Sequence, residues 1–275
     1  MTGLSSMTAA APVAHEPATF PAASNAAVTS VFGLPFRRWT MADTLSWVDR
    51  SIADFAVDAR PRQLITANLH TCMIAADSVD LRLLAAQTAD VATVADGMPM
   101  VWASRAMPAP LPERVAGSEL IFRVAEQAAA RGHRLFLLGA APDVLDATAS
   151  RLRSDYPGLV ICGRESPPYR ALSTDEHNDL CGRIRSTRPD VLLAALGQPK
   201  GELWLARHRA ELGAAVSIQL GASFDFVAGR VRRAPRWVQR TGLEWSFRLA
   251  MEPRRLIGRY LANTRFLLGQ LTRRR

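Results

Sequence analysis

Asp96, followed by Gly97, is the residue best suited to acid–base chemistry in this sequence. It comes directly after a short apolar run, residues 90–95, that we expect to be a strand. A carboxylate at a strand end can take a proton from a hydroxyl group, and a positioned general base contributes about 10²–10⁴ in rate. The alternative interpretation is a turn aspartate that caps the following segment.

Three other polar residues lie at comparable places. Thr66 and Asn68 offer a hydroxyl and an amide at the end of a neighbouring expected strand, and both could instead cap the helix that follows. Arg114 precedes an expected helix and could meet a phosphate or a sugar. Its alternative is an ion pair with Glu113 or Glu119.

Glycines follow two further expected strands, at Gly139 and in the block Gly197–Glu202. Such turns bring backbone N–H groups and a helix N-terminus close to phosphate oxygens. GxGxxG and GxxxxGK[ST] are missing, which argues against a standard dinucleotide site and a P-loop NTPase. HxxxH, HExxH, GxSxG and DxD are missing too, so we predict no metal site, no serine nucleophile and no cofactor.

The elements that would position these residues are visible as an alternation of short apolar runs with longer helical patterns. This alternation predicts an α/β fold, Rossmann-like, with a largely parallel sheet flanked by helices on both faces. In such sheets ligands bind beyond the carboxyl ends of the strands, where the polar residues above would meet. The expected strands are 63–67, 90–95, 135–138, 159–163, 191–196 and 215–220; the expected helices are 40–59, 70–87, 117–131, 143–154, 174–187 and 202–212.

The charge is concentrated at the C-terminal end. The chain carries +9, but residues 229–275 hold 13 Arg, no Lys and two Glu, which is +11 and leaves −2 for residues 1–228. We therefore divide the chain into a disordered leader (1–35), an α/β domain (36–228) and a basic helical appendage (229–275). The helical patterns 235–249 and 254–271, separated by Pro253, predict an amphipathic surface for an anionic membrane. Equally, Leu256, Tyr260, Leu267 and Leu271 could pack on the main domain.

Two absences limit the function classes further. No run of about 18 apolar residues occurs, so we expect no membrane-spanning segment. The cysteines, Cys72, Cys162 and Cys181, are scattered and odd in number, so they indicate thiols in a reducing compartment and neither a disulfide framework nor a zinc site.

Several blocks together resemble one known family. They are Thr66–Asn68, Asp96-Gly97, Leu111–Ser118, Leu135–Gly139, Gly197–Trp204, Gly221–Gly229, Arg233–Trp237 and Gly242–Trp245, followed by Arg248-Leu249 and Glu252-Pro253. This set, spread over about residues 40–262, resembles the WecG/TagA/CpsF family of bacterial glycosyltransferases. The resemblance implies transfer of an N-acetylmannosaminyl or hexosyl group from a UDP-sugar to an undecaprenyl-diphosphate-linked acceptor, in capsule, exopolysaccharide or cell-wall polymer synthesis. It implies inversion without a metal ion.

The resemblance also assigns roles to residues. Asp96 falls on the catalytic base, Thr66 and Asn68 on the substrate pocket and Arg114 on a functional arginine. The substrate-binding set is completed by Gly97, Gly117, Ser118, Gly139, Gly197, Gln198, Glu202, Asp225, Arg248, Arg255 and Arg259, of which the last three bring positive charge from the appendage. The implied partners are the UDP-sugar, the polyprenyl-diphosphate-linked acceptor and the anionic inner face of the cytoplasmic membrane. Self-association is compatible with the resemblance.

This sequence departs from the family pattern at the fourth strand end. The usual block reads Gly-Ala-Pro-x-Gln-Glu, whereas here Gln198 replaces Ala and Gly201 replaces Gln. The family's Gly-Tyr-Phe segment is here Pro168–Arg170. Both changes bear on the identity of the donor sugar. The alternatives are a non-catalytic peripheral membrane protein and a nucleic-acid-binding protein; the interleaving of Trp and Leu with the arginines, without a DNA-binding motif, disfavours the latter.

Overall fold

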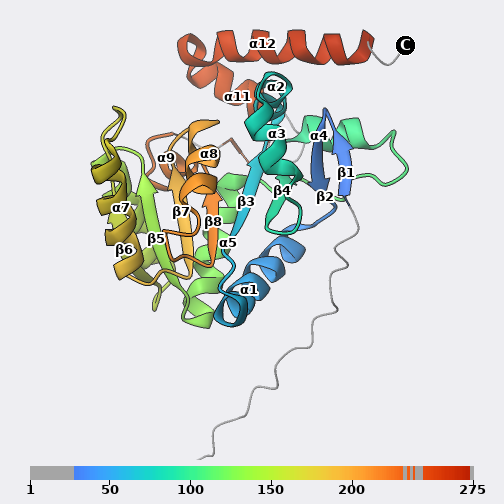
Figure 1. The fold of residues 1–275 in the computed structure, drawn as a ribbon. Helices are drawn as coiled ribbons and strands as arrows, with labels where there is room; N and C mark the ends of the chain where they lie inside the picture. The colour runs from blue at the N-terminus through green and yellow to red at the C-terminus, as the bar shows by residue number, and fades with distance from the viewer. Residues whose placement is uncertain (1–27, 232–233, 236–237, 239–243, 273–275) are drawn as a thin grey trace, which may run out of the picture.

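The computed structural model describes residues 28–231, 234–235, 238 and 244–272 (Figure 1). Its centre is a six-stranded sheet with the order β4-β3-β8-β7-β5-β6, in which all neighbouring strands are parallel. The strands are β3 (Arg62–Ala67), β4 (Val91–Ala95), β5 (Arg134–Gly139), β6 (Val160–Glu165), β7 (Val191–Ala195) and β8 (Val216–Gln219). This arrangement confirms the predicted α/β fold.

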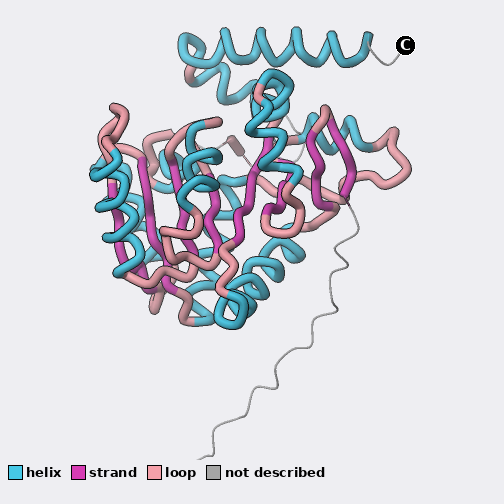
Figure 2. The backbone as a smooth tube through the Cα atoms, viewed as in Figure 1, coloured by secondary structure: helices cyan, strands magenta, loops and turns pink. Residues whose placement is uncertain are grey.

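Helices cover both faces of this sheet (Figure 2). One face packs on α1 (Met41–Asp58), α5 (Gly117–Arg131), α6 (Pro142–Asp155) and α9 (Ser223–Val227). The other packs on α2 (Leu69–Asp77), α3 (Val79–Ala86), α7 (Thr174–Ser186) and α8 (Lys200–His208). Because both faces are covered, a strand such as β4 is buried along its whole length, which explains its uninterrupted apolar run.

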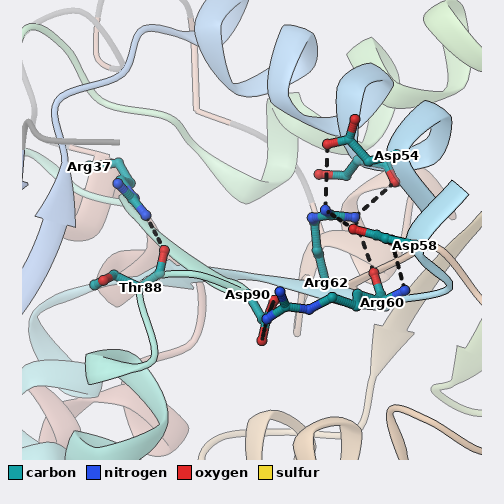
Figure 3. Close-up of polar contacts among 8 residues, drawn as sticks. Arg37, Asp54, Asp58, Arg60, Arg62, Thr88 and Asp90 are labelled. Atoms are coloured by element: carbon teal, nitrogen blue, oxygen red, sulfur yellow. Dashed lines mark hydrogen bonds and ion pairs between the residues drawn. The ribbon is translucent and has the colours of Figure 1, made fainter. Parts of the chain in front are cut away.

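A group of charged contacts fixes the amino ends of the strands (Figure 3). Arg62 of β3 pairs with Asp58 at 2.8 Å and Asp54 at 3.4 Å, both on α1. Arg60 pairs with Asp90, just before β4, at 3.0 Å. These contacts hold α1 and the starts of β3 and β4 at one edge of the sheet, which leaves the opposite, carboxyl edge for the site.

Residues 28–35 correct the predicted leader. They belong to an antiparallel hairpin of β1 (Val28–Val31) and β2 (Leu34–Arg37), whose Val31, Leu34 and Phe36 enter the core. Strands of four residues give too short an alternation to stand out in an Ala- and Ser-rich stretch. Residues 1–27 lie outside the described part of the chain.

The single helix predicted for 70–87 is also wrong. Ser78 divides it into α2 and α3: its backbone is extended (φ −107°, ψ 105°), and its hydroxyl accepts from Leu81 N–H at 3.3 Å. Two short helices were not predicted, α4 (Met98–Ser104) and α9. Each has eight residues or fewer, so neither completes enough turns for a clear helical period.

The appendage forms α11 (Glu244–Met251) and α12 (Pro253–Thr272), with Pro253 opening the second helix as the sequence predicts. Of the helix predicted for 235–249, the structure describes Pro235, Val238 and then the residues from Glu244 onward. α12 crosses α2 (Figure 1). Leu256 and Asn263 are buried on its inner face, and Phe266 and Leu267 pack on the core, which confirms the packing interpretation for Leu256 and Leu267. The side chain of Leu271 lies outside the described residues. None of the described helices is long and apolar enough to cross a membrane.

Candidate active site

Asp96 and Asn68 lie side by side at the carboxyl ends of β4 and β3. The backbone N–H of Asp96 donates to Ala67 O at 2.9 Å, which extends the β3–β4 pairing by one residue. A Cβ placed on Gly97 would stand 4.0 Å from Cβ of Asn68. The sheet thus brings together two predicted site residues that are separated by a helical crossover in sequence.

Asp96 as a whole residue is partly exposed, but its carboxyl is surrounded by protein groups that perturb its pKa. Removal from water is the largest influence and raises the pKa of Asp96. Arg114 lowers this pKa, Glu244 raises it, and the Gly117 N–H and Arg248 lower it further. Desolvation prevails, so the carboxylate is a stronger base than an exposed aspartate.

Gly117 supplies that N–H because α5 begins unusually close to the sheet. A Cβ on Gly117 would lie 3.3 Å from Oγ of Ser223 and 3.5 Å from Oγ1 of Thr66. The first residue of α5 therefore donates its N–H to the Asp96 carboxylate, where the helix dipole favours negative charge. The capping interpretation concerned the segment that directly follows Asp96. This hydrogen bond goes instead to α5, and α4, which follows Asp96, has no side-chain cap.

Arg114 pairs with neither Glu113 nor Glu119. Its Nη1 lies 2.7 Å from Oε2 of Glu244, the first residue of α11, and the two side chains are only 15% and 13% exposed. Glu113 instead accepts a hydrogen bond from Met41 N–H. A nearly buried pair of this kind is disrupted at a high energetic cost when one partner is removed. The pair thus anchors the appendage beside Asp96.

Two of the three predicted appendage arginines reach the site. The guanidinium of Arg248 lies 5.1 Å from the ring centre of Phe226, and its Nε is buried without a hydrogen-bond partner among the described residues. Nη2 of Arg259 lies 3.5 Å from Oδ1 of Asn68. Arg255 belongs to α12, but its side chain lies outside the described residues. Positive charge is therefore gathered over the carboxyl ends of β3 and β4.

Thr66 and Asn68 turn out to have structural partners. Thr66 is 4% exposed and donates its hydroxyl to Gln219 O at 3.0 Å. Asn68 is the N-cap of α2, where its Oδ1 accepts from Thr71 N–H at 3.2 Å. The capping alternative for Asn68 is thus confirmed, and the residue still borders Asp96 and Arg259.

The two predicted glycine turns stand next to each other at the ends of β5 and β7. Gly139 has φ +89°, and a Cβ there would lie 2.7 Å from Ala195 O, so only glycine fits without a shift of the backbone. Gly197 has φ +80°. The side-chain amide of Gln219 connects this turn to β7, donating to Ala194 O and accepting from Gly197 N–H, each at 3.0 Å. Phosphate binding at these turns stays a prediction.

Three other predicted residues have less direct positions. Glu202 is 1% exposed, and burial raises the pKa of its carboxyl to about 7, so its substrate contact stays a prediction. Ser118 is 8% exposed in the first turn of α5. Asp225 is partly exposed in α9, and its backbone oxygen accepts from Arg230 N–H at 3.0 Å.

Glu244, Phe226 and Thr71 were missed as members of the site. Glu244 and Phe226 stand inside family-like sequence blocks, so a signal existed, but nothing local connects Glu244 with Arg114 across 130 positions. Cys181 on α7, His208 at the end of α8 and Glu211 just after it also have potential metal-ligand atoms within 4.8 Å of one another. Their close approach is explained by hydrogen bonds that the Glu211 carboxylate accepts from both partners.

Comparison with known proteins agrees with this geometry. Residues 29–275 match the glycosyl transferase WecG/TagA/CpsF family. Three relatives carry the name N-acetylglucosaminyldiphosphoundecaprenol N-acetyl-β-D-mannosaminyltransferase. The Bacillus spizizenii protein is 34% identical over 58% of this chain and 60% of its own length, and the Bacillus subtilis protein 35% identical over the same shares. The Staphylococcus aureus protein is 28% identical over 85% of this chain and 88% of its own length.

The match therefore spans three fifths of the length of the Bacillus relatives and most of the Staphylococcus one. The family match runs through the hairpin, the sheet and the appendage, including Asp96, Arg114 and Arg248. On the extent of that match, this chain belongs to the WecG/TagA/CpsF family of glycosyl transferases.

Proposed function

We propose that this protein transfers a sugar from a UDP-sugar to a polyprenyl-diphosphate-linked sugar, by a single displacement with Asp96 as the general base. The observation that supports it most is the Asp96 carboxyl, desolvated at the end of β4 and faced by Arg114 and Arg248. In the proposed step Asp96 takes the proton of the acceptor hydroxyl. The hydroxyl oxygen bonds to C1 of the donor sugar as the bond from C1 to UDP breaks, which inverts the anomeric centre.

The leaving UDP gains negative charge, which the site must stabilise. Arg248 and Arg259 are suited to this role because α11 and α12 bring their guanidinium groups to the carboxyl edge of the sheet. Arginine also offers a planar set of donors that suits phosphate oxygens. We propose that these side chains act on the diphosphate directly, so that catalysis needs no added metal ion.

The relatives' name suggests the substrates. It describes an N-acetylmannosaminyl group that is transferred to N-acetylglucosaminyl-diphosphoundecaprenol. We propose a lipid-linked acceptor of this class and an N-acetylhexosaminyl or hexosyl donor. The donor is kept broad because Gln198 and Gly201 depart from the family pattern close to the predicted phosphate turn.

The outer face of α12 supports a place at a membrane surface. Ile257, Leu261 and Leu268 are 54%, 55% and 59% exposed, and Arg254 and Arg265 are exposed on the same face of the helix. Apolar side chains flanked by arginines suit the boundary between acyl chains and anionic headgroups. The outer face of α12 is thus available to a membrane, while its inner face packs on the domain.

The test is a donor screen. Purified protein is incubated with a short-chain polyprenyl-diphosphate N-acetylglucosamine, detergent and a panel of UDP-sugars, and UDP release is followed with and without EDTA. Release with one donor, unaffected by EDTA, is the expected result. No release with any donor, together with no binding of UDP, would favour the non-catalytic membrane protein. Full activity in an Asp96→Asn variant would reject Asp96 as the base.

A further inference from the structure

The turn between β7 and α8 connects physically to the candidate active site. Nε2 of Gln198 donates to Oγ1 of Thr71, in the first turn of α2, at 3.0 Å. The same side chain hydrogen-bonds to the carboxyl of Glu202, whose Oε2 is buried without a partner among the described residues. Gln198 therefore joins a buried carboxyl on α8 to the start of α2.

Thr71 continues this connection to Asn68. Its Oγ1 donates to Oδ1 of Asn68 at 3.3 Å and accepts from the Asn68 N–H at 3.1 Å. Glu202, Gln198, Thr71 and Asn68 thus form a continuous series of hydrogen bonds, here called the relay, with Arg259 of α12 at its far end. Thr71 and Glu202 are each 1% exposed, so water competes little for these bonds.

The relay explains why the glutamine of this turn stands at 198. A Cβ at Gly201 would collide with the side-chain amide of Gln219. Gln219 is 2% exposed and bound to Ala194 and Gly197, so it cannot easily move aside. A side chain at position 201 therefore has no room in this protein. The two departures from the family pattern, Gln198 and Gly201, are thus compatible: the glutamine occupies position 198, and glycine occupies the position without space.

We propose that Gln198 is a positioning residue for the transfer reaction, which holds Asn68 in place through Thr71 and is itself anchored by Glu202. Because the Oδ1 of Asn68 is held by the α2 turn, its Nδ2 remains the donor available to a ligand. The proposal rests on the proposed function to the extent that Asn68 contacts a substrate. Gln198 acts behind that contact and is not itself a catalytic residue.

The kinetic test uses Gln198→Ala and Thr71→Val. Each removes one member of the relay, and we expect each to lower kcat/KM about tenfold, as for loss of a buried hydrogen bond. The double variant should fall no further than either single variant, because both interrupt the same series. The matched control is Thr187→Val, which removes a similar hydroxyl, donating to Ile184 O at 2.8 Å, at the end of α7. This control should keep the wild-type kcat/KM.

A second measurement does not depend on turnover. Hydrogen exchange is followed at the Thr71 and Cys72 amides, which donate to Asn68. Gln198→Ala should accelerate exchange there and leave the capped start of α7, Glu176 N–H on Ser173, unchanged. Unaltered kcat/KM in Gln198→Ala, or strictly additive losses with Thr71→Val, would overturn the positioning role. A wild-type protein that binds no UDP and releases none contradicts the proposed function instead, and accelerated exchange would then still support the relay.

Discussion

At the scale of single residues, Asp96 combines its proposed catalytic role with a cost to stability. Its carboxylate is desolvated, and this raises its pKa above the value in the unfolded chain. A group of this kind stabilises the fold at pH values below its unfolded pKa, and that contribution is lost as pH rises through its folded pKa. Wherever the pH exceeds that folded pKa, the ionised side chain lowers the stability of the fold, which is a cost that the proposed function imposes.

We accordingly predict that Asp96→Asn loses nearly all transfer activity and gains thermal stability at pH 7.5. Asparagine keeps the shape and can no longer take a proton or carry a buried charge. UDP release and the thermal midpoint, measured on the same preparation, check the two effects. Isothermal titration with UDP is the control that the donor site persists. A lower midpoint with activity retained contradicts this account.

The charged neighbours of Asp96 predict two opposite shifts in the acidic limb of the kcat/KM–pH profile. Glu244 raises the pKa of Asp96, so Glu244→Gln should move the limb to lower pH. Arg248 lowers that pKa, so Arg248→Ala should move the limb to higher pH. The profile measured for each variant tests the signs, and movement in the same direction in both would show that another group controls the limb.

Gly201 predicts a coupled effect on stability. Gly201→Ala places a Cβ against the Gln219 amide and should destabilise by about 1–3 kcal/mol. In a Gln219→Ala background the same substitution should cost far less, because the obstructing amide is gone. Urea unfolding of the four proteins in this cycle measures the coupling. Additive losses would mean that the two residues do not obstruct each other.

At the scale of elements, the strands were the most predictable part. The apolar runs of β4, β5 and β7 are almost wholly buried, and the predicted bounds differ from the observed ones by a few residues. The break at Ser78 was missed because apolar residues continue on both sides of it, and only the local bond from Leu81 reveals it. The hairpin and the short α4 and α9 carry too few residues for a period.

The appendage shows what amphipathicity can and cannot predict. Its arginines and leucines predicted a helix with two sides, and the side named for packing, which includes Leu256 and Leu267, does face the domain. The pattern did not indicate that Leu261 and Leu268 would stand exposed on the other side. Leu256 is buried inward while Leu261 is exposed outward, although both interrupt the same basic stretch. Only the packing of α12 on α2 separates them, and that depends on residues far away in sequence.

We therefore predict that Leu261→Glu combined with Leu268→Glu weakens binding to vesicles of anionic lipid by more than tenfold. Each buried leucine contributes about 1.5–3 kcal/mol, which the glutamates remove while adding repulsion. Val57→Glu, a similar change at an 89% exposed position on α1, is the matched control and should bind as the wild type does. Co-sedimentation measures all three, and equal binding would place the membrane surface elsewhere.

At the scale of the whole molecule, Glu202 predicts a pH dependence of stability. Its pKa of about 7 lies above the ordinary 4.5, so its stabilising contribution is complete below about pH 4.5 and declines up to about pH 7. Glu202→Gln should remove this decline and gain roughly 3 kcal/mol on the wild type between pH 4.5 and 7.5. Unfolding free energies at both pH values check it; parallel curves would contradict a buried, titrating Glu202.

The predicted site residues came together because parallel strands end at one edge, a rule that needs only the fold class. Asp96, Asn68 and Gly197 were therefore accessible to reasoning from the sequence. The pair of Arg114 with Glu244 and the relay through Thr71 were not, since they depend on how α2, α8 and α11 pack in three dimensions. Contacts between side chains that are distant in sequence leave no local pattern. They are therefore harder to predict than the helices and strands themselves.

The order of the strands also bears on the kinetics of a two-substrate reaction. α12 lies beside α2, over the β3–β4 half of the carboxyl edge, whereas the two glycine turns lie at β5 and β7 (Figure 1). In the proposed reaction an acceptor held by its lipid would approach from the α12 side, and a donor arriving from water would lie along the edge, from the glycine turns to the arginines over β3 and β4. The donor does not have to depart before the acceptor arrives, so the site can hold both substrates at once. A single displacement requires this, whereas a mechanism through a covalent sugar–enzyme intermediate does not.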